Sequence, residues 1–330
     1  MRKKIIWISI TILLVGSAVI IWQIMNKPKK SADISDAMDL ERIDGFDELE
    51  EQVVVKKDIT YNKKYGNSKM DVYMPKENYG TPKPTIFWAH GGAFIAGDKK
   101  SVADYSTMLA SQGYVVVNMN YSLAPDYEYP VPVLQVGDAY LYMAANKDYF
   151  DVDLDHVAFG GDSAGGQIMG QFTNVQVNPE YAEKIGIEPV VKDPETIDAV
   201  IFFSALLDIN QYDENENEKA NVIFDESAQA YFGLENWKGS NKVNDANIID
   251  NVTSSYPPVY ITDGNTVSFQ DHAEELVEQL ENEQVPVTST FFPVEEAELR
   301  HQYQFKLSLP QSVENYEALL TFLDKRFKKE

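Results

Sequence analysis

The pentapeptide Gly161-Asp162-Ser163-Ala164-Gly165 constrains this chain more than any other segment, because it sets a serine between glycines directly after the apolar run Val157–Phe159. A strand that turns sharply into a helix holds the serine hydroxyl above the edge of a sheet, and so tight a turn tolerates only small residues beside it. The segment therefore predicts a strand, a nucleophile elbow at Ser163 and a following helix. Asp162, beside the serine, is expected to be structural.

A second glycine-rich motif, His90-Gly91-Gly92-Ala93-Phe94, follows another apolar run. A serine that attacks a carbonyl creates a negatively charged oxygen, which needs amide donors that already point at it. Glycines allow the backbone to approach that closely. We assign the donors of this oxyanion hole to the backbone amides of Gly91, Gly92 and Ala164.

The composition limits the partners of the chain. Its 330 residues include 52 Asp and Glu against 28 Lys and Arg, which gives a net charge of −24. This acidity argues against nucleic acid or anionic lipid surfaces as partners. The chain contains no cysteine, which excludes disulfides, thiolate nucleophiles, thiolate metal sites and lipidated cysteines. The chemistry expected of the two motifs requires no metal or other cofactor.

The N-terminal segment, 1–30, resembles a membrane anchor. Ile5–Met25 carries no charge, and at about 1.5 Å per residue a helix of this length spans about 30 Å, the thickness of the bilayer core. Basic residues lie on both sides in equal number, so the flanking charges do not set the orientation. Trp22–Met25 offers no small-residue cleavage site, which favours an uncleaved signal-anchor over a secretory signal. We expect a single-pass anchor with the rest of the chain on the extracytoplasmic side.

Residues 31–52 are strongly acidic, with Arg42 as the one basic residue after the two lysines that precede the segment. This composition is typical of a solvated linker. However, Ile43, Phe46 and Leu49 recur at helical spacing, so the segment could instead form an amphipathic cap helix over the active-site mouth. The sequence leaves both interpretations open.

Residues 53–330 alternate between strand-like and helix-like runs, which predicts one α/β domain with a mostly parallel eight-stranded sheet flanked by helices. The first two strands are expected to be antiparallel. The expected strands are Val53–Tyr61, Lys69–Met74, Thr85–Ala89, Tyr114–Asn118, His156–Phe159, Ile197–Phe203, Val259–Thr262 and Val287–Phe292. The expected helices are Val102–Ser111, Val133–Ala145, Ala164–Val175, Asp271–Glu283 and Ser312–Phe327.

Two intervals, 178–195 and 208–256, fit no strand–helix alternation. Long insertions of this kind usually carry function or remain disordered. Ala228–Gly233 and Trp237 give the second interval enough apolar surface to pack. We therefore expect 208–256 to form a cap that shapes substrate entry.

The general base can be chosen from only four histidines. In this type of fold the base follows the last strand. His301 lies on a loop after Val287–Phe292, whereas His90 belongs to the glycine motif, His156 begins the strand before the elbow and His272 begins a helix. A serine hydroxyl is a weak nucleophile until a base takes its proton, so the sequence assigns His301 this role.

With these motifs the chain resembles the α/β-hydrolases similar to hormone-sensitive lipase, which are carboxylesterases and lipases. The resemblance covers about residues 69–327 and also rests on Tyr121–Pro125, Tyr129–Pro132 and Pro257-Pro258. It implies the α/β-hydrolase fold and a serine–histidine–aspartate triad, in which Ser163 and His301 occupy the first two positions.

The third position departs from the family. An ungapped comparison from Pro257-Pro258 puts Val267 where the family has its aspartate. A valine cannot orient an imidazole, and loss of this carboxylate costs related triads several orders of magnitude in rate. Three substitutes are available: Asp271 in the following helix, Asp263 at the end of the seventh strand and Asp208 after the sixth. We favour Asp271, although a carboxylate there is equally typical of a helix N-terminus.

The sequence thus predicts a membrane-anchored serine hydrolase that cleaves carboxylic esters through an acyl-enzyme. Its predicted location is compatible with short-chain or glycan-linked acetyl esters as substrates. Val267 supports an alternative, a catalytically weak or inactive member of the fold that serves as a membrane-tethered binding module. The oligomeric state and the ester specificity do not follow from the sequence.

Overall fold

The computed structural model describes residues 45–212 and 218–328. The predicted anchor, residues 1–30, and most of the acidic segment 31–52 lie outside the described residues. Within the described ranges, no helix is long and apolar enough to cross a membrane.

Eight strands form one sheet in the order β1-β2-β4-β3-β5-β6-β7-β8. The strand β2 pairs antiparallel with both β1 and β4, and all other neighbours are parallel. This topology confirms the predicted mostly parallel sheet with an antiparallel opening. The strands are β1 (Val53–Thr60), β2 (Lys69–Pro75), β3 (Lys83–Ala89), β4 (Val115–Met119), β5 (Val152–Asp162), β6 (Ile197–Phe203), β7 (Val259–Thr262) and β8 (Val287–Thr290).

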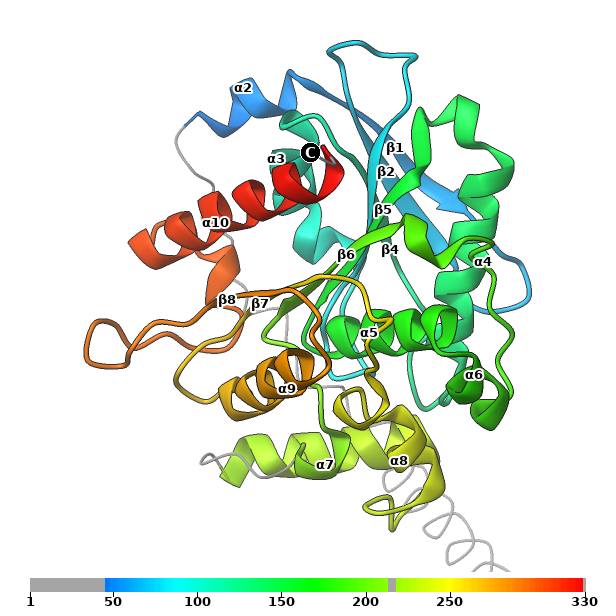
Figure 1. Ribbon diagram of the computed structural model, residues 1–330, viewed down its shortest axis with the longest axis vertical. Helices are drawn as coiled ribbons and strands as arrows, with labels where there is room; N and C mark the ends of the chain where they lie inside the picture. The colour runs from blue at the N-terminus through cyan, green and yellow to red at the C-terminus, as the bar shows by residue number, and fades with distance from the viewer. Residues whose placement is uncertain (1–44, 213–217, 329–330) are drawn as a thin grey trace, which may run out of the picture. The chain divides into compact units, whose positions relative to one another are not determined.

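Helices cover both faces of the sheet (Figure 1). One face packs against α3 and α10, and the other against α4, α5 and α9. The helices are α2 (Phe46–Glu50), α3 (Ala103–Ser111), α4 (Val131–Ala145), α5 (Ala164–Val177), α6 (Pro179–Ile185), α7 (Glu218–Phe232), α8 (Asn241–Ala246), α9 (Gln270–Asn282) and α10 (Pro310–Phe327).

The strand β3 shows why its residues form a central strand. Ile86 and Trp88 belong to the apolar layer beneath α3 and α10, while Phe87 and Ala89 belong to the opposite layer. Successive side chains of a strand point to opposite faces, so a continuous apolar run fits only a strand that is buried on both sides. The carboxyl end of β3 therefore delivers His90 and the glycine motif to a fixed place at the sheet edge.

The described parts of the two intervals that fit no alternation contain helices. Pro179 begins α6, the Asn178 side chain accepts a hydrogen bond from the Tyr181 amide, and Gly186 ends the helix at φ 67°. These are ordinary helix start and stop signals that the sequence analysis missed. The interval 208–256 forms α7, α8 and two short 3₁₀ helices and buries Trp237. Its role as a cap over the substrate remains a prediction.

The described end of the acidic segment forms α2, which buries Phe46 and contacts α3 and β1. In Figure 1 this helix lies at the opposite end of the sheet from α7 and α8.

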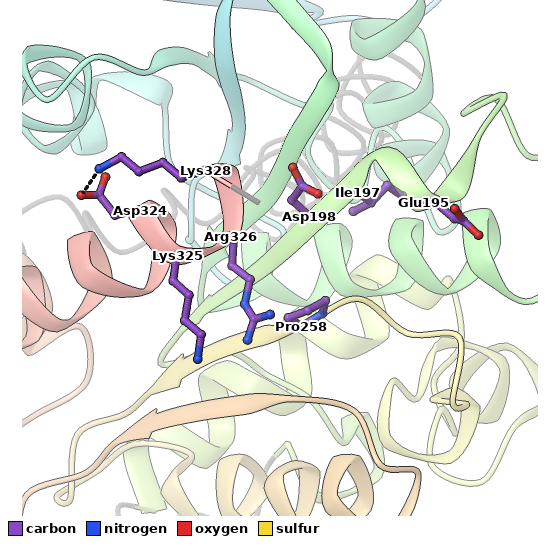
Figure 2. Close-up of a pocket in the computed structure, with 8 residues that line it drawn as sticks. All are labelled: Glu195, Ile197, Asp198, Pro258, Asp324, Lys325, Arg326 and Lys328. Carbon is purple, nitrogen blue, oxygen red and sulfur yellow. Dashed lines mark hydrogen bonds and ion pairs between the residues drawn. The ribbon is translucent and has the colours of Figure 1, made fainter. Parts of the chain in front are cut away.

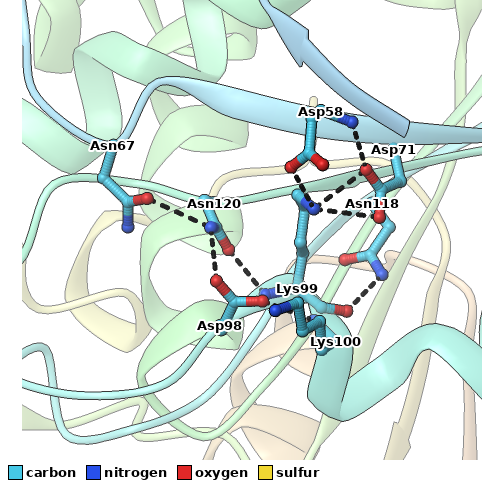
Figure 3. Close-up of polar contacts among 8 residues, drawn as sticks. All are labelled: Asp58, Asn67, Asp71, Asp98, Lys99, Lys100, Asn118 and Asn120. Carbon is cyan, nitrogen blue, oxygen red and sulfur yellow. Dashed lines mark hydrogen bonds and ion pairs between the residues drawn. The ribbon is translucent and has the colours of Figure 1, made fainter. Parts of the chain in front are cut away.

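A buried lysine anchors the loop that follows the glycine motif (Figure 3). Lys99 is only 2% exposed, and its Nζ lies 3.0 Å from Oδ2 of Asp71 on β2 and 3.1 Å from Oδ1 of Asp58 on β1. Its backbone amide donates to Asn120, and its carbonyl accepts from Asn118 on β4. A buried cation is stable only when paired and hydrogen-bonded, so this cluster ties the loop to three strands.

Candidate active site

Ser163 lies in the sharp turn that the pentapeptide predicts. The strand β5 ends at Asp162, α5 begins at Ala164, and Ser163 between them has φ 52° and ψ −122°. This conformation is costly for a residue with a side chain and persists only where its surroundings impose it. A Cβ at Gly161 would lie 2.5 Å from the Gly165 carbonyl carbon, and one at Gly165 would lie 2.0 Å from the Ala89 oxygen. Both glycines are therefore required by close packing of the backbone.

Three backbone amides are available near the elbow. Among the described residues no hydrogen bond is found from the amides of Gly92 or Ala93. Ala164 opens α5, where the first amides of a helix have no intrahelical partner. The Ser163 backbone is itself held, since its amide donates to the Phe203 carbonyl at 2.9 Å.

The amide of Gly91 is already used. It donates to Oδ2 of Asp162 at 2.8 Å, and a backbone amide has a single proton to give. This bond corrects the prediction that Gly91 contributes to the oxyanion hole. The motif alone could not show it, because the acceptor lies far from Gly91 in sequence, on another strand.

Asp162 joins three segments. Besides Gly91, its carboxylate accepts from Trp88 Nε1 on β3 at 3.0 Å and from Gln302 Nε2. Burial raises the pKa of Asp162 to about 6, an effect that these hydrogen bonds oppose. Asp162 precedes Ser163 in the chain, and Gln302 follows His301. The hydrogen bond from Gln302 to Asp162 therefore brings the histidine loop to the elbow.

His301 contacts a serine. Its Nδ1 lies 2.9 Å from Oγ of Ser268, and that hydroxyl donates to Oδ1 of Asp263. The imidazole ring also contacts the ring of Phe269 edge to face, with ring centroids 5.3 Å apart. Burial lowers the pKa of His301 to about 4, so the imidazole is neutral at pH 7 and can accept a proton.

The structure separates the three candidates for the triad acid. Asp271 is an exposed residue in the first turn of α9, and no hydrogen bond or ion pair links it to His301 among the described residues. Asp208 caps a 3₁₀ helix and accepts from Asn247 Nδ2 at 3.0 Å. Asp263 alone of the three is linked to His301, through Ser268. The preference for Asp271 is therefore corrected, because its position suits a helix N-terminus.

Aromatic rings connect the interval 208–256 with the site. Phe94, at the end of the glycine motif, stacks on Tyr231 of α7 with ring centroids 3.9 Å apart. The ring of Phe224 on α7 packs against Phe269, with centroids 5.5 Å apart, and Phe269 in turn contacts His301. The helix α7 therefore contacts both the glycine motif and the neighbour of the histidine.

A cavity of about 710 Å³ lies elsewhere on the domain (Figure 2). The residues that line it include Ile197, where β6 begins, Pro258, just before β7, and the last residues of α10. Its charged residues are of both signs, and Lys328 is paired with Asp324 at 2.8 Å. Ser163, by contrast, follows the carboxyl end of β5, so this cavity is not part of the site. No cluster of potential metal ligands occurs in the residues that the structure describes.

The topology of the sheet and the elbow define an α/β-hydrolase. The chain belongs to the BD-FAE family, whose model matches residues 70–280. It is 27% identical to Esterase LipC of Mycobacterium tuberculosis over 216 residues, which are 64% of this chain and 51% of LipC, so it spans about half the length of that relative. It is 28% identical to the versiconal hemiacetal acetate esterase of Dothistroma septosporum over 231 residues, 68% of this chain and 69% of that protein. The solved structure of esterase B from Lactobacillus rhamnosis shares its fold, with a TM-score of 0.73, 22% identity, and coverage of 84% of this chain and 87% of that one.

Asp162→Ala is expected to lower the free energy of unfolding at pH 7.5 by about 2 kcal/mol or more. It leaves Trp88, Gly91 and Gln302 without their acceptor, at about 1 to 3 kcal/mol for each buried donor. Part of this cost is offset, because a carboxylate with a pKa of about 6 in the fold itself costs about 3 kcal/mol at this pH. Urea denaturation measures the change. Asp155→Ala, at an exposed position of the same strand, is the matched control, and equal stability of the two variants would contradict the role of Asp162.

Asp263→Asn is expected to gain stability relative to the wild type as the pH rises. Burial raises the pKa of Asp263 to about 7, whereas in an unfolded chain it is about 4. The folded state therefore holds the proton more tightly than the unfolded chain does. The contribution of protonated Asp263 to the free energy of unfolding of the wild type is fully present below about pH 4 and is lost as the pH rises through 7. The difference between variant and wild type should grow between pH 4 and 8, to at most about 4 kcal/mol. Urea denaturation across this range tests it, and a difference that does not change with pH would refute it.

Proposed function

We propose that this chain is a serine hydrolase that cleaves carboxylic esters through an acyl-enzyme intermediate. The observation that carries the proposal is the strained elbow at Ser163. The amides of Gly92 and Ala93 beside it have no hydrogen-bond partner in the part of the chain that the structure describes. The His301 loop is hydrogen-bonded to the elbow through Gln302 and Asp162. Membership of the BD-FAE family and the names of its relatives, which include LipC and other esterases, support it.

In the proposed mechanism, neutral His301 takes the proton of the Ser163 hydroxyl as its oxygen attacks the ester carbonyl. The tetrahedral intermediate carries a negative oxygen, and protonated His301 then gives its proton to the departing alcohol. Water next attacks the acyl-serine while His301 again accepts a proton. The second tetrahedral intermediate collapses to the carboxylic acid as protonated His301 gives its proton to the departing Ser163 oxygen, which restores the hydroxyl and the neutral imidazole. Every step uses groups of the chain, the ester and water.

The oxyanion donors in this mechanism are the amides of Gly92, Ala93 and Ala164. Gly92 and Ala164 are retained from the sequence prediction, and Ala93 replaces Gly91, whose proton is held by Asp162. Because amides fixed by the backbone need no reorganisation when the charge develops, they can stabilise the transition state strongly.

The alternative of an inactive binding module rests on Val267, which leaves the imidazole without the family's aspartate. The contact between Ser268 and His301 weakens this argument, because it gives the imidazole a polar partner at Nδ1. The comparisons also favour the hydrolase, since the relatives reported above bear the names of esterases.

Ser163→Ala is expected to abolish both hydrolysis of p-nitrophenyl acetate and labelling by a fluorophosphonate. His301→Ala should lower kcat by about 10⁴-fold, as removal of a triad base does. His156→Ala is the control, since His156 pairs with Asp198 near the start of β5. Labelling of folded Ser163→Ala protein, or a folded wild type that neither turns over nor is labelled, would overturn the proposal.

The proposal also places the enzyme on a membrane, with Ile5–Met25 as a single-pass anchor and the catalytic domain on the extracytoplasmic side. The length of this segment and its lack of charge support the anchor. In cells that express the full chain, the protein should fractionate with membranes and be degraded when protease is added outside intact cells. A chain that begins at Ser31 should leave the membrane fraction. Recovery of the full chain in the soluble fraction would contradict the anchor.

A further inference from the structure

We propose that a hydroxyl–carboxylate relay, made of Ser268 and Asp263 behind it, orients the imidazole of His301 in place of a directly bonded aspartate. The inference rests on the proposed function, because it gives His301 the role of base. Ser268 and Asp263 are positioning residues that act through the histidine.

The hydrogen bonds determine which ring nitrogen carries the proton. A serine hydroxyl has one proton and two lone pairs, and an ionised carboxylate can only accept. Burial raises the pKa of Asp263 to about 7, so above this pH its carboxylate is mostly ionised. The Ser268 proton then goes to Asp263, and Ser268 Oγ, 2.9 Å from Nδ1, accepts the Nδ1 proton of His301. In this tautomer Nε2 is unprotonated, which is the form a general base needs in order to take a proton from serine.

The backbone holds the relay in place. The Gly264 amide donates to Asp263 at 2.7 Å, and the Thr266 amide donates to the Leu299 carbonyl at 3.0 Å. A Cβ on Gly264 would lie 2.5 Å from the Arg300 oxygen, so the loop after β7 and the histidine loop pack backbone to backbone. Because the two backbones approach this closely, the side chains of Ser268 and His301 can reach hydrogen-bond distance.

Asp263 is otherwise hard to explain as a structural residue. It is only 1% exposed, and no ion pair reaches it among the described residues. A buried carboxylate without a cation is costly, and such groups concentrate at functional sites. Within the relay its negative charge has a use, because it stabilises the imidazolium that forms when His301 takes the Ser163 proton.

Val267 shows what the relay replaces. It occupies the family's aspartate position and has φ 48°, a conformation that is unusual for a β-branched residue and more common for Asp or Asn. The loop thus keeps a backbone shape that suits an aspartate while the side chain there has no polar atom. The neighbouring Ser268 supplies the polar contact to the ring.

The test compares kcat and KM for p-nitrophenyl acetate among full-length variants. Ser268→Ala is expected to lower kcat by about 10²-fold or more with little change in KM, because it removes the hydrogen bond that fixes the tautomer and the orientation of the His301 ring. Ser268→Thr keeps the hydroxyl and should stay within about threefold of the wild type. Ser289→Ala, at an exposed serine on β8, is the matched control.

A double-mutant cycle separates the relay from a structural role. Asp263→Asn should lower kcat by about 10-fold or more, and the double variant Ser268→Ala/Asp263→Asn should be no slower than Ser268→Ala alone, because Asp263 acts only through Ser268. Additive losses, or losses that follow the free energy of unfolding across the variants, would overturn the relay. Should Ser268→Ala fail to fold, Asp263→Asn and Ser268→Thr carry the kinetic test.

The ¹⁵N shifts of the His301 ring give a readout independent of turnover. The wild type should show a protonated Nδ1 and a bare Nε2, and Ser268→Ala a mixture of tautomers. An Nε2-protonated ring in the wild type refutes the relay. If the wild type hydrolyses esters and is labelled at Ser163, and Ser268→Ala is equally fast, the relay is refuted and the proposed function stands. If the folded wild type neither hydrolyses esters nor is labelled, the proposed function itself is refuted.

Discussion

The active site depends on one buried carboxylate. Asp162 accepts hydrogen bonds from the indole of Trp88, the amide of Gly91 and the amide group of Gln302. These donors come from β3, the glycine motif and the histidine loop, and the last of these is distant from the other two in sequence. Because the residue that follows Asp162 is the serine of the elbow, one side chain links the proposed nucleophile, the glycine motif and the loop that carries the proposed base.

The cost of this arrangement is electrostatic. Burial raises the pKa values of Asp162 and Asp263 and lowers those of His90 and His301. Burial disfavours the charged form of each group. At pH 7 the cost falls on the two carboxyl groups, which water would hold ionised. Sites that carry chemistry commonly sacrifice stability in this way. The large two-layered apolar core supplies the stability that offsets it.

Much of the domain could be predicted because its signals are local. The elbow, the antiparallel pair of strands that opens the sheet and the helices around the sheet follow from apolar runs and glycines within a few residues of one another. The helix α6 also had a local signal, Asn178-Pro179 before it and Gly186 after it, which the analysis overlooked. The donors and partners at the site had no such signal. Whether Gly91 or Ala93 offers a free amide depends on Asp162, which belongs to a different strand much further along the chain.

The amino-acid sequence by itself determined the fold class and the strained turn at Ser163, and it singled out His301 as the candidate base, since these depend on residue types at short spacing and on chain order. Only the tertiary structure decided which aspartate is linked to the histidine. An ungapped comparison puts Val267 at the family's aspartate position, and the sequence offers Asp271, Asp263 and Asp208 as substitutes without showing that Asp271 is exposed. The link through Ser268 to Asp263 exists because the loop after β7 packs against the histidine loop. A contact between loops that are separated by a helix and a strand leaves no periodic pattern in the chain.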